Sequence, residues 1–158
     1  MSDAVDDALA VLLHPSADAG AAVARGQALE DLLARADEAH PRLLELAVGE
    51  HPPLLAIKAL PRFGRPESVP VLERLLRDAP APTTVVAAAA LSEHPAPAAR
   101  TALEAALGDE RQQVVLSAVM GLAERGERES CAPLQAARSH PDEEVRERVE
   151  AALGRLGC

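Results

Sequence analysis

The sequence predicts an all-α protein, a right-handed α-solenoid (an α-α superhelix) of about ten antiparallel helices. Three observations favour this fold class. Similar residues recur every 31 positions through much of the chain. The 158 residues are 48% hydrophobic but only 1% aromatic, so the core must consist mainly of Leu, Val and Ala, and Leu and Ala are strong helix formers. Apolar residues also fall at helical spacing between Pro and Gly turn signals.

The 31-residue period relates five columns of positions. Four columns hold small or apolar residues, and one holds residues typical of helix starts. Upstream the phase slips by two, because Leu43 lies 29 residues before Leu72, which indicates an earlier and less regular unit. The columns are Gly64, Pro95, Gly126 and Gly157; Leu60, Leu91, Leu122 and Leu153; Ala56, Ala87, Ala118 and Val149; Leu72, Leu103 and Leu134; and Asp78, Asp109 and His140.

Each period contains two helices, a first helix A and a second helix B. In the last full period, apolar residues between 114 and 122 form one stripe of a helix, and Gly126 ends it in the left-handed conformation that glycine adopts cheaply. A shorter helix follows over 129–138. Pro141 then starts the next helix, with Asp142 in its first turn, where a carboxylate complements the helix dipole.

The same reasoning applied along the chain predicts ten helices in one domain over residues 1–158. We expect irregular units over 1–49 and regular repeats over 50–157. A single helix pair cannot bury its apolar stripe, so successive pairs must stack on each other. The helices are expected near 3–13, 17–35, 39–48, 53–63, 67–77, 83–93, 97–107, 110–124, 129–138 and 142–156.

Two stretches carry a family resemblance. Residues 56–78 (AIKALPRFGRPESVPVLERLLRD) and 145–157 (VRERVEAALGRLG) resemble the HEAT-like repeat of the phycobilisome-lyase type. The resemblance covers residues 50–157 clearly and 17–49 loosely. It implies an armadillo-like helical superhelix, a fold that serves lyases, scaffolds, adaptors and metal-dependent hydroxylases alike.

The sequence departs from this family pattern at one ladder of side chains. The resemblance implies an Asp before helix A and an Arg early within it in each repeat, and these side chains form the ladder along the stack. Asp78 and Asp109 are present, but the positions equivalent to Arg146 hold Val115 and Thr84. We therefore expect apolar contact between helices to supply most of the stacking energy.

Charge and composition exclude several function classes. A formal net charge of −9 disfavours nucleic acid and anionic membrane surfaces, and the scarcity of aromatic residues leaves no platform for stacking bases. No signal peptide and no apolar run of about 20 residues is visible. Cys131 and Cys158 are expected to be reduced thiols, and the protein is expected to be cytoplasmic.

No catalytic or metal-binding set emerges from the sequence. All five histidines precede proline, and we expect each to end one helix while proline begins the next. Glu50-His51 and Glu93-His94 reverse the His-Glu order of HEAT-class di-iron hydroxylases and fall out of the 31-residue phase. We therefore expect no metal, no cofactor and no enzymatic activity. The histidines are His14, His40, His51, His94 and His140.

The remaining candidate is a surface. B helices usually line the concave face of such solenoids, so their charged residues form a candidate strip for an acidic peptide or helix, or alternatively an ordinary solvated face. We predict a protein-binding scaffold or adaptor. The alternative is a bilin lyase-like subunit or chaperone acting on a chromophore protein, and a DNA-repair glycosylase is disfavoured by charge and composition. The candidate partner-binding residues are Arg42, Glu45, Arg74, Arg77, Arg100, Glu104, Gln135 and Arg138.

Overall fold

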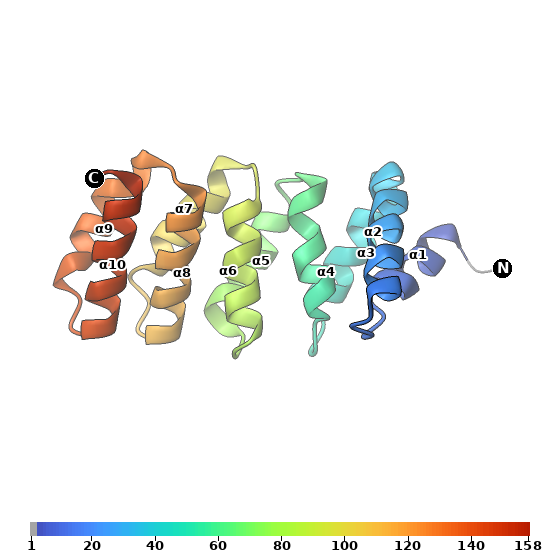
Figure 1. The fold of residues 1–158 in the computed structure, drawn as a ribbon, viewed down its shortest axis with the longest axis horizontal. Helices are drawn as coiled ribbons and strands as arrows, with labels where there is room; N and C mark the ends of the chain where they lie inside the picture. Colours follow the sequence, from blue (N-terminus) through green and yellow to red (C-terminus); the bar gives the residue numbers. More distant parts are fainter. Residues whose placement is uncertain (1–2) are drawn as a thin grey trace.

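The computed structural model describes residues 3–158, and these form ten α-helices and three short 3₁₀ turns with no β-strand (Figure 1). Residues 1 and 2, which the domain prediction includes, lie outside the described part. The helices are α1 (Ala4–Leu12), α2 (Ala19–Ala34), α3 (Ala36–Ala47), α4 (Leu54–Ala59), α5 (Ser68–Asp78), α6 (Thr83–Glu93), α7 (Pro97–Ala106), α8 (Gln112–Arg125), α9 (Cys131–Ala136) and α10 (Glu143–Leu156). The 3₁₀ turns are η1 (Leu60–Phe63), η2 (Arg128–Ser130) and η3 (Ala137–Ser139).

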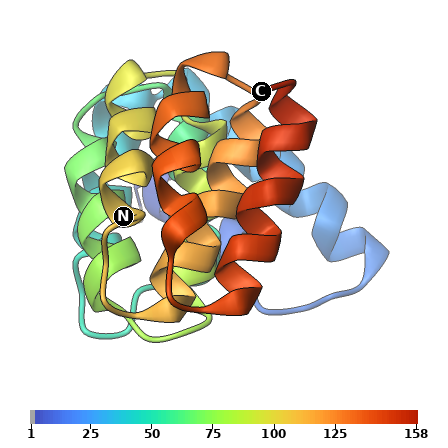
Figure 2. The ribbon, with the colours of Figure 1, turned by 90° about the vertical axis from the view of Figure 1, so that its left-hand side faces the viewer.

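The regular repeats pack as two layers in one row. The A layer contains α4, α6, α8 and α10, and the B layer contains α3, α5, α7 and α9 (Figures 1 and 2). Within the A layer, α6 packs on α4 and α8, and α10 packs on α8. Each B helix packs on the A helix that follows it in the chain. Helices one repeat apart are therefore neighbours, which confirms the predicted solenoid.

The 31-residue columns form the core between the layers. Alanine at three of four positions in one column lets the A helices approach closely, and Gly121 has the same effect because a Cβ there would lie 3.0 Å from Leu103 Cδ2. The apolar contact that holds the stack is worth about 25 cal/mol per Å² of buried apolar area. Three columns are at most 2% exposed: Ala56, Ala87, Ala118 and Val149; Leu60, Leu91, Leu122 and Leu153; and Leu72, Leu103 and Leu134.

Glycines end three of the four A-layer segments, as the periodic column predicted: Gly126 and Gly157 follow α8 and α10, and Gly64 follows η1, the 3₁₀ turn that continues α4. Gly64, Gly126 and Gly157 have φ of 63°, 68° and 72°, the left-handed conformation in which other residues are strained. The fourth position in the column is Pro95, and there α6 ends at Glu93 with His94 already extended. The end of α6 consequently needs another means of satisfying its carbonyl groups.

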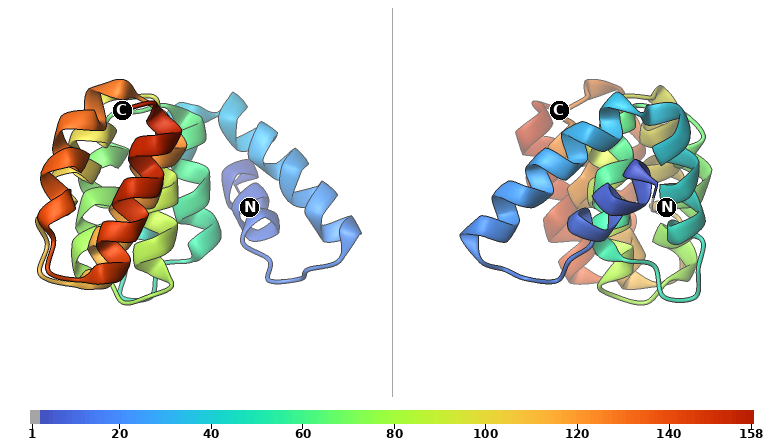
Figure 3. Two further views of the ribbon diagram at one scale, coloured as in Figure 1. Left: turned by 60° about the vertical axis from the view of Figure 1, so that its left-hand side comes forward. Right: turned by 90° about the vertical axis from the view of Figure 1, so that its right-hand side faces the viewer.

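The N-terminal hairpin of α1 and α2 is the irregular unit. Figure 3 shows α2 splayed away from the stack. Only Ala28 and Leu32 of its 16 residues are buried, and Val23 is 64% exposed. Asp18 nonetheless caps the start of α2 by accepting a hydrogen bond from Ala21 N at 2.7 Å. Among the described residues, no helix combines the length and apolarity needed to cross a membrane.

The structure corrects the prediction that His40 lies at a turn between helices. His40 and Pro41 lie inside α3, which begins at Ala36. The start is three residues earlier than predicted because Asp37 and Glu38 in the first turn complement the positive end of the helix dipole. Pro41 removes one backbone donor but does not end the helix.

The structure also corrects the prediction of reduced thiols. Cys131, at the start of α9, forms a disulfide with Cys158, with 5.9 Å between their Cα atoms. Their separation of 27 residues in sequence gave no hint of this, because the turn after α10 returns to the start of α9 only in the folded stack. Disulfides are rare in a reducing cytosol, so the redox argument for a cytoplasmic location no longer holds.

Candidate functional site

The predicted partner-binding residues lie on B helices or the adjoining turns, but most of their charges are paired within the molecule. Glu45 and Gln135 are exposed. Three of the arginines form ion pairs on or near the surface, and such pairs are weak enough for a partner to exchange them. These pairs are Arg42 with Asp6, Arg77 with Glu73 at 3.0 Å, and Arg138 with Glu150 at 2.7 Å.

Arg100 and Glu104 are partly covered by the next repeat. The Arg100 guanidinium lies 3.1 Å from Glu127 Oε2, 3.5 Å from Glu104 Oε1 and 3.7 Å from Glu129 Oε2. Ser130 Oγ donates to Glu104 Oε1 at 2.8 Å. The Arg100 side chain is only 24% exposed. This network ties α7 to the turn before α9, so binding a partner through Arg100 would require breaking contacts that hold the stack.

Arg74 differs from the other predicted cations. It is exposed, and among the described residues its side chain has no ion pair and no hydrogen bond. It lines a cleft of about 480 Å³ between the turn that follows α3 and the turn that follows α5. Glu50, His51 and Asp78 also line this cleft. Of the predicted arginines, Arg74 is therefore the one that is most available to a ligand.

A second hollow lies between α5 and α7. It has a volume of about 350 Å³, with Val69 and Ala102 buried at its base. Its exposed lining includes Pro70, Thr101 and Ala105. These small side chains leave a shallow groove between successive B helices that a peptide or helix could enter.

The histidines serve mainly to shape turns. In three of the five His-Pro pairs, Nδ1 accepts a hydrogen bond from the backbone N–H two residues later, as an Asn or Asp side chain does in a turn. The N to Nδ1 distance is 3.3 Å at His14 and 3.1 Å at both His94 and His140. These three histidines lie in turns as predicted, but the prediction that the following proline begins the next helix is wrong, because the next helix begins at Ala19, Pro97 or Glu143.

His94 is also a buried link between repeats. Because its Nδ1 accepts from Ala96 N, its Nε2 carries the proton and donates to Arg65 O at 3.0 Å. His94 as a whole is only 1% exposed. Burial lowers its pKa, the hydrogen bond to Arg65 O opposes this, and the nearby Arg125 charge lowers the pKa further. His94 is therefore held in the neutral form.

The structure brings His40 and Ser68 together, a pair that sequence reasoning missed. His40 Nε2 lies 2.8 Å from Ser68 Oγ, and the His40 ring lies 5.8 Å from that of Phe63. Ser68 is fully buried at the start of α5, so no substrate can reach its hydroxyl. Burial, aided by the Arg65 charge, lowers the pKa of His40. The pair joins α3 to α5 and is not a catalytic dyad.

Arg125 supplies the cap that α6 lacks. Its Nη1 donates to Leu91 O at 2.9 Å and to His94 O at 2.7 Å, and its Nη2 pairs with Glu127 Oε1 at 2.6 Å. The side chain is 6% exposed. Arg125 is the last residue of α8, so one repeat satisfies the open carbonyl groups of the repeat before it.

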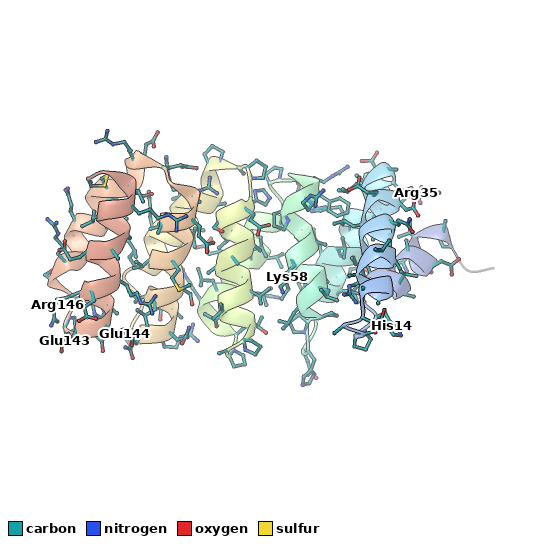
Figure 4. All side chains as sticks on the ribbon, viewed as in Figure 1. His14, Arg35, Lys58, Glu143, Glu144 and Arg146 are labelled. Atoms are coloured by element: carbon teal, nitrogen blue, oxygen red, sulfur yellow. A yellow bond between two sulfur atoms is a disulfide. The ribbon has the colours of Figure 1, made fainter. Side chains whose placement is uncertain are left out.

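Arg146 is the one arginine at the ladder position of the regular repeats, and its hydrogen bonds are local. Arg146 Nη1 donates to His140 O and Pro141 O, both at 2.8 Å, within its own turn at the start of α10 (Figure 4). Asp109 Oδ1 accepts from Arg111 N at 2.9 Å, also locally. Over residues 3–158, His, Cys, Asp and Glu side chains form no group of three that could hold a metal ion.

Comparison with known families agrees with this geometry. Two overlapping stretches, residues 53–119 and 101–157, match the family model of HEAT repeats. The chain belongs to the HEAT-repeat family. HEAT repeats generally serve in protein–protein interaction. The match does not single out the phycobilisome-lyase type, and none of the curated proteins matches the chain.

Proposed function

We propose that this HEAT-repeat chain is a non-enzymatic scaffold or adaptor that binds another protein or a peptide through the outer face of its B layer. The groove between α5 and α7 is the observation that supports the proposal most. It is open, its lining side chains are small or proline except for Glu73, whose carboxylate pairs with Arg77, and it shares α5 with the unpaired Arg74. HEAT arrays offer extended surfaces of this kind.

The chemistry of this surface favours an acidic segment. Small apolar side chains such as Ala102 and Ala105 give a partner backbone close access, and Arg74 supplies a cation for a carboxylate. Arg42, Arg77 and Arg138 add cations whose surface ion pairs can be exchanged. The lyase-like alternative remains a prediction that no observation in the structure supports.

Site-specific crosslinking tests the proposal. A photoreactive residue in place of the exposed Thr101 should capture a partner from a lysate of the source cells, and Arg74→Glu should reduce the capture. Lys58→Glu, which makes the same charge change on the A layer, should leave it unchanged (Figure 4). Arg100 is left intact, because its loss would disturb the stack itself.

Two results would contradict the proposal. Capture from Thr101 that is equally weakened by Arg74→Glu and Lys58→Glu would reflect overall charge and not this face. Absence of any protein crosslink from the B layer, with the variant folded by circular dichroism, would move the interaction to another surface.

A further inference from the structure

The A layer carries a second groove, between α8 and α10. It has a volume of about 230 Å³. Val119, Ala123 and Ala152 line it, and Met120 on its rim is 45% exposed. The exposed part of the α10 wall consists of Ala151 and two arginines, Arg148 and Arg155. The groove is thus apolar at its base and cationic along one side.

The two arginines on this wall have no internal partners. Among the 15 arginines of the chain, all lying within residues 3–158, twelve pair with a carboxylate or bond a backbone carbonyl group. Arg148 and Arg155 do neither, and the third exception is Arg74 on the B layer. Glu124 across the groove accepts from Ser92 Oγ at 3.0 Å. On a chain of net charge −9, two unpaired cations in one groove mark a local site for an anionic group.

The spacing of the arginines suits a helix. They are seven residues apart on α10, so they lie about 10.5 Å apart along the helix axis and on the same side. Carboxylates at positions i and i+7 of a helix laid along the groove would meet both. An apolar residue between those carboxylates would contact Met120, whose flexible thioether side chain adapts to varied partners.

We propose that the groove between α8 and α10 binds an acidic amphipathic helix of a partner protein. This inference rests on the proposed scaffold function and adds a second surface on the opposite layer. The carboxylates of the helix pair with Arg148 and Arg155, and its apolar face covers Met120 and Ala123. A partner that spans both layers would contact the B layer at α5 and α7 and the A layer at the neighbouring α8 and α10.

A synthetic peptide tests the groove directly. The probe is an amphipathic helix of about 18 residues, with two Glu seven positions apart and Leu between them on the same face. A matched peptide carries Gln at both Glu positions. In fluorescence anisotropy at low salt, the Glu peptide should bind about three- to tenfold more tightly than the Gln peptide, because both arginines are exposed and exposed ion pairs are individually weak.

Variants of the protein locate the binding. Replacing Arg148 and Arg155 together by Gln should remove the preference for the Glu peptide. Met120→Ala should weaken both peptides. Arg74→Gln, which removes the other unpaired arginine, should change nothing. Thermal melting of each variant checks that the fold is intact.

Several outcomes would overturn the proposal. They are no binding of the Glu peptide, equal binding of the two peptides, or the same loss from Arg74→Gln as from the double variant. Self-association in sedimentation that the double variant abolishes would make a second copy of the chain the occupant. If the peptide fails but the crosslink from Thr101 persists, the scaffold function stands and only the α8/α10 groove is rejected.

Discussion

Loss of the disulfide between Cys131 and Cys158 is expected to loosen the C-terminal repeat selectively. The bond joins the start of α9 to the residue that follows Gly157, and Arg128 Nη2 donates to Gly157 O at 3.2 Å beside it. In a stack, a terminal unit has a neighbour on one side only, so its stability depends more on such a cross-link.

The magnitude follows from the loop that the bond closes. With a sequence separation of 27 between the cysteines, the chain-entropy relation gives a contribution of about 3.5 kcal/mol at 25 °C. For a chain of this size, each kcal/mol shifts the melting temperature by about 2–4 °C. The melting temperature should therefore fall by about 10 °C.

Cys158→Ser is the suitable variant, because Cys158 is exposed and its replacement leaves no cavity. Thermal melts should show the lower melting temperature in this variant with or without reductant, and in the native chain only with reductant. Hydrogen exchange should increase more in α9 and α10 than in α4. Two free thiols in the denatured, unreduced native chain, or a melting temperature that reductant does not change, would refute the reasoning.

Three further predictions concern the stack itself. Gly121→Ala should cost about 1–3 kcal/mol in urea unfolding, because the new Cβ would lie 3.0 Å from Leu103 Cδ2 and 3.2 Å from Ala88 O. Arg125→Met should cost about 3 kcal/mol or more in the same assay, because it leaves His94 O without the donor that Arg125 supplies and removes the cation paired with Glu127. Stability should decrease as the pH is lowered below about 6.5, because burial lowers the pKa of His94, so the unfolded chain binds more protons there.

Each of these predictions has a matched control. Gly154→Ala is the control for Gly121, since a Cβ at Gly154 meets no atom within 4 Å, and equal costs at the two sites would contradict the packing argument. Arg128→Met controls for the loss of an exposed arginine. For the pH dependence, His94→Asn should make the stability profile shallower between pH 7.5 and 5.5, with the buried His40 supplying the remaining slope, whereas His51→Asn, at an exposed loop position, should leave the profile unchanged.

The regular repeats could be predicted because the residues in one column have the same physical role in every repeat. The glycines at 64, 126 and 157 each end an A helix, and the apolar columns each face the core. His40 could not be placed, because a proline inside a helix and a proline at its start look alike in sequence. The partners of Cys131 and Arg125 depend on how successive repeats stack, which no local pattern encodes.

The candidate surfaces likewise could be predicted from the sequence only in part. The sequence identified the B-layer arginines by their recurrence, but it could not show that Arg100 is tied to three glutamates or that Arg74 is unpaired. The groove between α8 and α10 was missed. The sequence does contain one indication of this groove. Arg148 stands 31 residues after Ser117, in the column of Leu55, Val86 and Ser117. The earlier positions in this column are partly or fully buried, whereas Arg148 is exposed.

Small-angle X-ray scattering tests the central claim, which is that the repeats stack in one row and each packs only against its neighbours. Five helix pairs stacked about 10 Å apart, each about 20–25 Å across, give a longest dimension of about 60 Å. A compact globule of the same length would have a radius of gyration of about 15 Å and a longest dimension of about 40 Å. A pair-distance distribution with an extended tail to about 60 Å is the predicted result, and a symmetric one ending near 40 Å would contradict the account.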